Sequence, residues 1–288
     1  MRHHRSMPSQ TDLAVAGDGT RLLLRQWPAH GDPWASVLVV HGLSEHSGRY
    51  EQLGEWLAGA GLRVHAYDHR GFGGSGGRRG HVDRWEQLLD DLQQRLAAVR
   101  DDGLPVVLFG HSMGGLICAE YAEDPRPQPD AMVLSAPGLD SGHPRYLHWL
   151  AAVLGRVLPL IAISGGHDFS VLSRDSAVGE AFRTDPMVVN RQTTRFGMEA
   201  FAAQSRTRAG IGRIHVPTLV IHGSDDWLVP LSASEALARL PGVERRVYPG
   251  LRHELHHEPE GRQVAADVVA WLRATVGGPT PPEPTDRA

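Results

Sequence analysis

The sequence predicts an α/β fold built around a mostly parallel β-sheet, and two observations carry that prediction. Short segments rich in valine, isoleucine and leucine recur along the 288 residues, each bounded by Gly, Pro or Asp, as buried parallel strands are. Between them lie longer segments whose apolar residues repeat with a helical period. Strands that alternate with helices in this way are typical of α/β proteins.

The first element is expected to be an antiparallel hairpin. Apolar segments between Val15 and Trp27 flank Gly17-Asp18-Gly19, and residues of this kind form tight turns between paired strands. The parallel strands that follow are predicted at Ser36–Val40, Leu62–Tyr67, Pro105–Phe109, Ala131–Ser135, Thr218–Ile221 and Glu244–Tyr248.

Helices are predicted between several of these strands. One has apolar residues at i, i+3, i+4 and i+7 spacing, at Trp85, Leu88, Leu89, Leu92, Leu96 and Val99. A second follows the strand at Pro105–Phe109 and covers Gly115–Tyr121. A last helix carries on one face Val264, Val268, Trp271 and Leu272.

The alternation stops between about Pro137 and His215. This stretch contains helical patterns such as Tyr146–Leu158 but no convincing strand, which predicts a helical lid inserted into the fold. The expected α/β core is therefore 11–136 and 216–276, with the lid at 137–215. The polar, proline-rich ends, 1–10 and 277–288, are expected to be disordered.

Composition excludes several classes of function. All 29 residues counted as Lys or Arg are arginine, so no lysine is present to form a Schiff base or to complete a phosphate-binding P-loop. The formal net charge is −4 and the arginines are scattered, so no nucleic-acid partner is expected. The single cysteine, Cys118, cannot form an intramolecular disulfide and is expected to be a small buried residue.

Neither a signal peptide nor a membrane-spanning helix is expected. The basic N-terminus is not followed by an apolar segment. The longest apolar stretch, Leu147 to Ile163, is interrupted by Arg156 and Pro159 and is short for a bilayer. We therefore expect a cytoplasmic protein, with peripheral contact to a membrane as the alternative, while the sequence leaves the oligomeric state open.

A serine nucleophile is predicted at Ser112. Gly110-His111-Ser112-Met113-Gly114 matches G-x-S-x-G, with a predicted strand before it and a predicted helix after it. A serine in this context sits on a sharp turn from strand to helix. The glycines of the motif are needed because side chains at their positions would clash with the neighbouring chain. The helix N-terminus also favours the negative charge that forms during attack.

The acid and the base that a serine nucleophile requires follow later in the chain. In this architecture they occur in the order Ser, Asp or Glu, His. Asp225 and Asp226 follow the strand at Thr218–Ile221, and His253 follows the strand at Glu244–Tyr248. Both positions lie beyond strand carboxyl ends, where open α/β sheets place their sites. The spacing does not choose between the two aspartates.

Two backbone amides are expected to form the oxyanion hole. One is the N–H of Met113, directly after the nucleophile, and the other is the N–H of Leu43, in the loop after the strand at Ser36–Val40. His41 could be mistaken for a base, but a His-Gly pair at a strand end more often shapes the loop.

The segments 41–50, 68–77 and 110–115 resemble the monoacylglycerol lipase family of α/β-hydrolases. The likeness extends from the hairpin to the final helix and includes 172–175 and 184–188 of the lid, which look closest to bacterial members. The resemblance implies an α/β-hydrolase fold and a serine esterase that converts a monoacylglycerol to fatty acid and glycerol. It also implies that the acid is Asp226, that the base is His253, and that the glycerol head group is bound by Glu45, Arg49 and His256.

Two other motifs are disfavoured by their context. His253-Glu254-Leu255-His256-His257 matches the zinc motif H-E-x-x-H, which works only on a helix, and Pro249-Gly250 before it and Pro259 after it oppose a helix. Gly71 to Gly76 match G-x-G-x-x-G, yet the loop continues instead of opening into a helix. We expect no metal and no cofactor.

Several alternatives stay open. The substrate could be a lysophospholipid or another carboxylic ester, with the same three catalytic residues. More remote are a zinc peptidase at His253 and His257, and an inactive binding protein of the same fold. The apolar helix at Tyr146–Leu158 is either buried on the core or a lid helix whose outer face contacts a membrane or lipid droplet.

Overall fold

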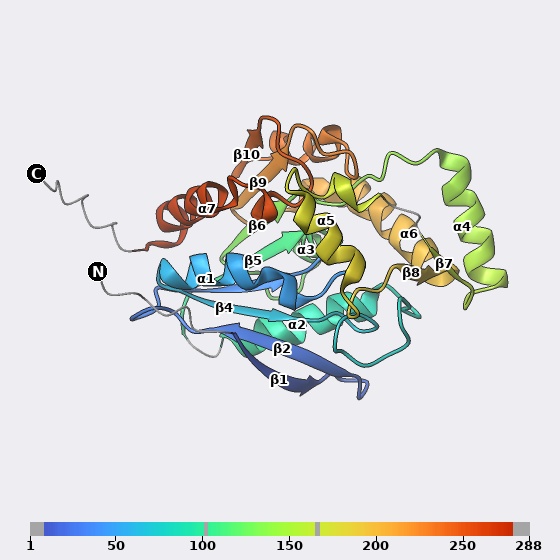
Figure 1. Cartoon of the computed structure of the whole chain (residues 1–288), viewed down its shortest axis with the longest axis horizontal. Helices are drawn as coiled ribbons and strands as arrows, with labels where there is room; N and C mark the ends of the chain where they lie inside the picture. The colour runs from blue at the N-terminus through green and yellow to red at the C-terminus, as the bar shows by residue number, and fades with distance from the viewer. Residues whose placement is uncertain (1–8, 101–102, 165–167, 279–288) are drawn as a thin grey trace, which may run out of the picture.

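The computed structural model describes residues 9–100, 103–164 and 168–278 (Figure 1). The two terminal segments that were expected to be disordered, 1–10 and 277–288, lie mostly outside these ranges. Where the two overlap, the chain is regular, because strand β1 already includes Gln10 and Gly277 caps the last helix with a φ of 85°. Cys118 is buried, as expected.

Eight strands of the described residues form one sheet in the order β1-β2-β4-β3-β5-β6-β9-β10. Strands β1 and β2 form the expected antiparallel hairpin, β2 is antiparallel to β4, and the remaining neighbours are parallel. The prediction of a mostly parallel sheet is thus confirmed. The strand bounds are β1 Gln10–Val15, β2 Arg21–Trp27, β3 Ala35–Val40, β4 Leu62–Tyr67, β5 Val106–His111, β6 Ala131–Ser135, β9 Thr218–Gly223 and β10 Val243–Tyr248.

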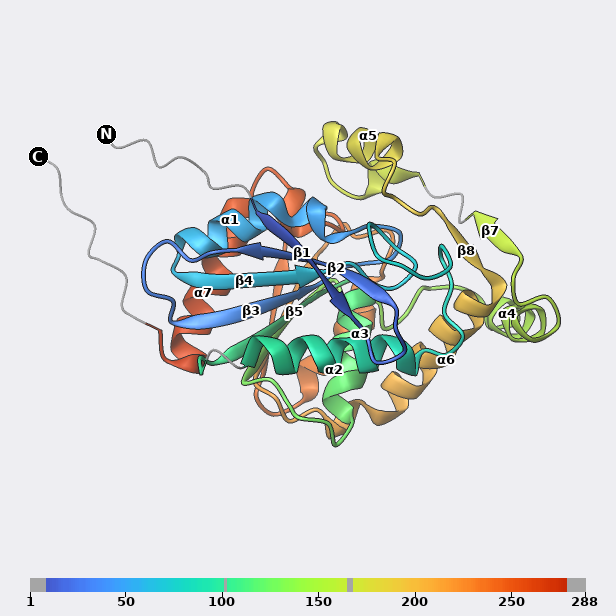
Figure 2. The ribbon, with the colours of Figure 1, turned by 90° about the horizontal axis from the view of Figure 1, so that it is seen from below.

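Helices cover both faces of this sheet (Figure 2). One face packs on α2 and α3 and the other on α1 and α7, and alternate residues of each central strand enter the two cores. In β3, Leu38 and Val40 face one side while Val37 and Val39 face the other. The helix bounds are α1 Glu51–Gly59, α2 Glu86–Arg100, α3 Met113–Glu123 and α7 Gly261–Val276.

The segment between β6 and β9 leaves the sheet and forms the helices α4 Arg145–Val157, α5 Ser176–Thr184 and α6 Thr194–Gly210. It also contains two short strands, β7 Ala162–Ser164 and β8 Arg191–Thr193, which pair in antiparallel fashion. The expectation that this region has no strand is corrected here. A strand of three residues is too short to display a repeat that sequence analysis can detect.

Within the insertion, α6 packs against α3 of the core, and α4 packs on the outer side of α6. A side-chain carbon added at Gly155 of α4 would lie 2.6 Å from the Cβ of Met198 on α6, so the two helices approach closely at this glycine. In both views α4 lies at the end of the molecule beyond α6 (Figures 1 and 2). No helix of the described residues is long and apolar enough to cross a membrane.

Candidate active site

Ser112 occupies a strained turn between β5 and α3. Its φ and ψ are 52° and −116°, a conformation that few residues other than glycine adopt. The turn is held by neighbouring backbone, because the Ser112 N–H donates to the Ser135 carbonyl at 2.9 Å. A Cβ at Gly114 would lie 1.9 Å from the Val40 carbonyl oxygen, so the glycine of the motif is required by close packing. This strain fixes the direction of the serine side chain.

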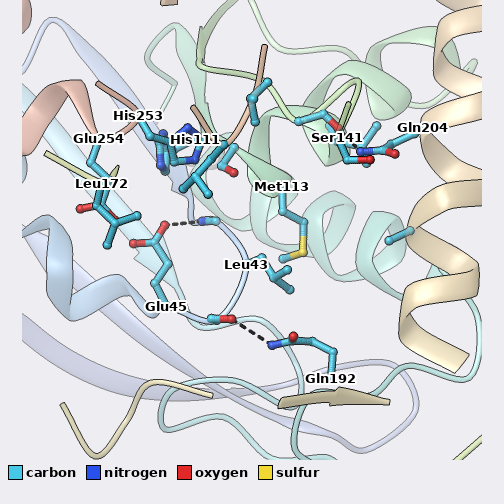
Figure 3. A pocket seen from close by; sticks show the side chains of 18 of the residues that line it. Leu43, Glu45, His111, Met113, Ser141, Leu172, Gln192, Gln204, His253 and Glu254 are labelled. Atoms are coloured by element: carbon cyan, nitrogen blue, oxygen red, sulfur yellow. Dashed lines mark hydrogen bonds between the residues drawn. The ribbon is translucent and has the colours of Figure 1, made fainter. Parts of the chain in front are cut away.

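The side chain of Ser112 lines a pocket of about 400 Å³ at the carboxyl ends of the strands (Figure 3). Most of the wall is apolar and comes from α3, from the insertion with its helix α6, and from the loop after β9, with Leu116, Phe169, Leu172, Phe182, Phe196, Ala200, Phe201, Leu228 and Val229. Polar side chains lie at separate places on this wall, at Glu45, Asp140, Ser141, Asp168, Gln192, Gln204, His253 and Glu254. An apolar pocket with a few polar groups suits an amphipathic ligand.

His253 and Asp226 form a hydrogen-bonded pair next to this pocket. The Nδ1 of His253 lies 2.8 Å from Oδ2 of Asp226. The other carboxylate oxygen, Oδ1, accepts hydrogen bonds from the N–H groups of Leu228 and Val229, both at 2.9 Å. The side chain of Asp225 is exposed, and its carboxylate accepts from the neighbouring Ser224 Oγ at 2.7 Å. Of the two aspartates that spacing left open, Asp226 is the one that faces the histidine.

The electrostatics of this pair suit proton transfer. Burial lowers the pKa of His253, but the Asp226 carboxylate and its hydrogen bond outweigh burial, so the net pKa is raised above the ordinary value. Burial raises the pKa of Asp226, yet the charge of His253 and the hydrogen bonds from His222, His253 and Val229 hold it well below its usual range. An ionised carboxylate therefore stands ready to stabilise an imidazolium.

The loop after β3 lies directly beside Ser112. A Cβ at Gly42 would be 3.2 Å from the Cβ of Ser112, and both Leu43 and Met113 line the pocket. His41 shapes this loop, because its Nε2 accepts from the His69 N–H at 2.9 Å and its Nδ1 donates to the Gly42 carbonyl at 2.7 Å. Burial lowers the pKa of His41 to about 3, so the ring is neutral.

The insertion helps to hold the same loop. Gln192 of β8 donates from Nε2 to Ser44 Oγ at 2.9 Å, and the Val189 N–H donates to the Ser44 carbonyl at 2.8 Å. His46 Nε2 also lies 2.9 Å from Asp185 Oδ2. The position of the loop therefore depends on the insertion as well as on the sheet.

Glu45 is among the residues that line the pocket and Arg49 lies directly behind it, so a head-group role for Arg49 stays a prediction. The guanidinium of Arg49 is buried between two carboxylates, with Nε 3.3 Å from Glu45 Oε2 and Nη2 2.6 Å from Glu254 Oε2. The ring of Phe182 lies 4.6 Å from the guanidinium carbon. These contacts enclose the cation, and all three partners of Arg49 line the pocket.

His256 is not among the residues that line the pocket, but its ring lies 5.2 Å from the ring of His111, which does, so its role at the head group stays a prediction. His256 is buried, and its ring stacks on Tyr50 with 4.8 Å between centroids. Burial and the nearby His257 and His111 hold its pKa well below the ordinary value, so the ring is neutral.

The zinc-like motif is not arranged as a metal site on a helix. Residues Leu255–His257 form a 3₁₀-helix, and His253 turns to Asp226 instead. Within the described residues, the ligand atoms of Glu254, His256 and His257 do lie within 4.8 Å of one another. Glu254 Oε2, however, already accepts from Arg49 and lies 2.6 Å from His257 Nδ1. A cation there would have to compete with the arginine.

One wall of the pocket was missed in the sequence. Phe196, Ala200 and Gln204 are spaced four residues apart on α6 and all line the cavity. The helical spacing is visible in the sequence. What the sequence lacks is the packing of α6 on α3, which turns this face toward Ser112.

Comparison with known proteins gives consistent matches. The family model described as serine aminopeptidase, S33, matches residues 31–260. A monoacylglycerol lipase of Mycolicibacterium smegmatis is 35% identical over 282 residues, which are 93% of this chain and 98% of that protein. A human monoglyceride lipase is 35% identical over 298 residues, covering 98% of this chain and 97% of its own length. The crystal structure of Paleococcus ferrophilus monoacylglycerol lipase superposes with a TM-score of 0.80 at 32% identity, over 88% of this chain and 99% of that chain.

Proposed function

Since this chain belongs to the monoacylglycerol lipase family of α/β-hydrolases, we propose that it hydrolyses monoacylglycerols to fatty acid and glycerol through an acyl-enzyme on Ser112. One observation carries the proposal. Ser112, in its strained turn, and His253 line the same apolar pocket, and His253 is hydrogen-bonded to the buried Asp226. The resemblance to this family drawn from the sequence motifs is confirmed by the matches.

In the proposed mechanism, Ser112 Oγ attacks the ester carbonyl while His253 Nε2 takes the hydroxyl proton. Asp226 holds His253 in the tautomer whose Nε2 can accept a proton, because its carboxylate accepts a hydrogen bond from the Nδ1–H of His253. The protonated His253 then gives its proton to the departing glycerol oxygen. A water molecule, activated by the same histidine, cleaves the acyl-enzyme and releases the fatty acid.

The developing oxyanion is held in this proposal by the N–H groups of Leu43 and Met113. Its support is that both residues line the pocket, that Met113 directly follows Ser112, and that Gly42, the neighbour of Leu43, approaches the serine closely. One such donor is worth about 2.7–4 kcal/mol in other hydrolases. Backbone donors fixed by the sheet and by α3 need no reorganisation during the reaction.

Glu45 is the group that we propose for the glycerol head group. A carboxylate has about four lone-pair sites. Three are taken in Glu45, by the Gly42 N–H, by Tyr50 Oη at 2.7 Å and by Arg49 Nε. One site is left for a substrate hydroxyl, and Arg49 holds the Glu45 carboxylate from behind.

The assay uses the full chain, 1-decanoylglycerol and a fluorophosphonate probe. We expect release of decanoate and labelling of the protein, and the loss of both in Ser112→Ala. Faster turnover of lysophosphatidylcholine than of the monoacylglycerol would favour the lysophospholipase alternative. Activity that is sensitive to a chelator and indifferent to Ser112→Ala would favour a zinc peptidase, and an unlabelled, inactive protein would favour a binding function.

We also propose that α4 contacts a lipid surface. Its solvent-facing stripe is apolar, with Tyr146, Trp149 and Val157 each about two-thirds exposed, at 66%, 67% and 69%. These residues and Val153 recur at helical spacing, while the opposite face packs on α6. Because a monoacylglycerol partitions into membranes, an apolar stripe that binds the membrane surface would bring the protein to its proposed substrate.

Flotation with vesicles of a neutral phospholipid tests this contact. Trp149→Glu is expected to lower the floated fraction of the protein severalfold. Leu13→Glu is the matched control, because Leu13 is 55% exposed on the edge strand β1, far from the insertion in the chain. Unchanged flotation of Trp149→Glu would overturn the proposed contact and leave the proposed hydrolysis intact.

A further inference from the structure

The loop that carries His253 is held by its backbone on both sides of the histidine. The N–H of Arg252 donates to Glu258 Oε1 at 2.7 Å, and the N–H of Glu254 donates to the carbonyl of Leu172 at 2.8 Å. Figure 3 shows Leu172 and Glu254 close together beside His253. The first acceptor belongs to the end of the same loop and the second to the insertion, so both parts of the chain fix the backbone at the histidine.

The carboxylate of Glu258 joins these two parts directly. Its side chain is completely buried. While Oε1 accepts from Arg252, Oε2 accepts from the N–H of Arg174 at 3.2 Å and from its Nε at 3.0 Å. Arg174 belongs to residues 169–175 of the insertion, which precede α5 and which we call the insertion arm. Because a buried carboxylate needs such donors, removing them would leave its charge uncompensated.

Further hydrogen bonds connect the insertion arm to the loop of the histidine. Nη1 of Arg252 donates to the carbonyl of Ser170 at 2.7 Å and to the carbonyl of Ser173 at 3.0 Å. The same arm contributes Phe169 and Leu172 to the wall of the pocket. One wall of the pocket and the loop of the histidine are therefore fixed to each other.

The position of this loop matters because His253 has to meet two partners at once. Its Nδ1 is held by Asp226 at 2.8 Å, and its Nε2 has to reach the hydroxyl of Ser112 in the proposed reaction. Asp226 fixes one edge of the ring, and the backbone decides where the other edge lies. A displacement of about 1 Å at a reacting group can lower a rate by about 10²-fold. Glu258 is not among the residues that line the pocket, so any effect it has on the reaction passes through the loop.

We propose that Glu258, together with Arg174 of the insertion arm, is a positioning residue that places His253 for proton transfer. This inference rests on the proposed function, in which His253 takes the proton of Ser112 and gives it to the departing oxygen of the ester. The insertion then contributes to the chemical step as well as to the wall of the pocket, because its arm holds the base through a buried carboxylate.

The test uses the full chain and two decanoate esters that differ in their leaving group. The alkoxide of ethyl decanoate needs a proton from His253 to depart, whereas 4-nitrophenolate leaves 4-nitrophenyl decanoate as a stable anion without one. Both esters form the same decanoyl-enzyme on Ser112, so kcat/KM compares their acylation. We expect Glu258→Gln to lower kcat/KM for the ethyl ester by about 10- to 100-fold. The loss for the nitrophenyl ester should be smaller, so that the ratio of the two values changes.

Two further variants separate position from charge and from stability. Glu258→Asp keeps the charge but is one methylene shorter, so it cannot reach Arg252 and Arg174 together and should change the ratio in the same direction. Asp91→Asn is the matched control, because Asp91 is also a buried carboxylate, held by Arg70 Nε and Nη2 at 2.7 Å each, and lies on α2 outside the lining of the pocket. It should lower the free energy of unfolding in urea and leave the ratio unchanged.

A merely structural role of Glu258 predicts a different result, since a smaller folded fraction lowers kcat/KM for both esters by the same factor. Equal losses for the two esters in Glu258→Gln, or an unaltered ratio in Glu258→Asp, would overturn the proposal. If neither variant folds, Arg174→Ala takes their place, because the Arg174 side chain is 37% exposed and its loss leaves the backbone donors of Glu258 intact. Its ratio should change in the same direction by a smaller factor, and an unchanged ratio in folded Arg174→Ala would refute the role.

Measurement of 1-decanoylglycerol beside these esters separates this inference from the proposed function. If the glycerol ester is not hydrolysed but the ratio of the other two esters changes as expected, the monoacylglycerol function is refuted and the positioning role of Glu258 stands. If the glycerol ester is hydrolysed and the ratio is the same in every variant, the positioning role is refuted and the monoacylglycerol function stands.

Discussion

The replacement Asp226→Asn should abolish most activity while leaving the fold in place. An asparagine can still accept the N–H groups of Leu228 and Val229 through its carbonyl oxygen, as Oδ1 does now at 2.9 Å. Its NH₂ group would then face His253 Nδ1, where the carboxylate now accepts at 2.8 Å. The imidazole would have to carry its proton on Nε2 and could no longer take one from Ser112.

The expected loss in kcat is about 10⁴-fold, the size found when other serine hydrolases receive the wrong histidine tautomer. The expected loss in stability is small by comparison, about 1.5–3 kcal/mol for one charge-assisted hydrogen bond. Hydrolysis of 1-decanoylglycerol measures the first, and urea unfolding measures the second. A kcat loss that merely tracks the unfolded fraction would show that Asp226 serves stability alone.

Asp225→Asn is the matched control, because Asp225 carries the same group one residue away. Its carboxylate is exposed and accepts from the neighbouring Ser224 Oγ. We expect its kcat to stay within about twofold of the unaltered protein, as for surface changes away from a site. A loss in Asp225→Asn with retention in Asp226→Asn would refute the assignment of the acid.

Three further predictions follow from the same structure. In a pH–rate profile, kcat/KM should fall on the acid side with a midpoint above about 6.5, the ordinary histidine pKa. The reason is that His253 must be neutral to take the proton, and its pKa is raised. A midpoint below that value contradicts the prediction. Gly114→Ala should destabilise by about 3 kcal/mol or more, since the new Cβ would lie 1.9 Å from a carbonyl oxygen of β3, whereas Gly212→Ala meets no atom within 4 Å; thermal melts of both variants decide. Arg49→Ala should cost about 3–5 kcal/mol in urea unfolding, because it leaves two buried carboxylates without their cation, while Arg183→Ala, which removes an exposed pair, should not change the unfolding curve.

The centre of the sheet could be predicted because the strands β3, β5, β6 and β9 are covered on both faces. In β3, successive side chains enter the two cores in turn, so every position is buried. This gives a continuous apolar segment that can be recognised in the sequence. The short strands β7 and β8 had no such signal, since three residues in an insertion show neither alternation nor a long apolar run. Local pattern thus sufficed for the core and failed where tertiary pairing decides.

The same limit applies to the site. Ser112 was predictable because its turn forces a local pattern of glycines, and close packing against Val40 explains that pattern. The neighbours Asp225 and Asp226 have identical side chains, so only the fold, which buries one against His253, distinguishes them. Gln204 belonged to no motif, because its place in the pocket comes from the packing of one helix face.

Arg49 shows how tertiary structure adds to the role that a motif implies. Its cation lies beside Glu45, and Glu45 accepts the backbone N–H of Gly42, the residue before Leu43. Burial raises the pKa of Glu45, and the charge of Arg49 opposes that rise. An ionised Glu45 attracts the Gly42 N–H, and a protonated one would attract it less. We therefore propose that Arg49 influences the reaction through Glu45 and the loop that carries Leu43, the proposed oxyanion donor.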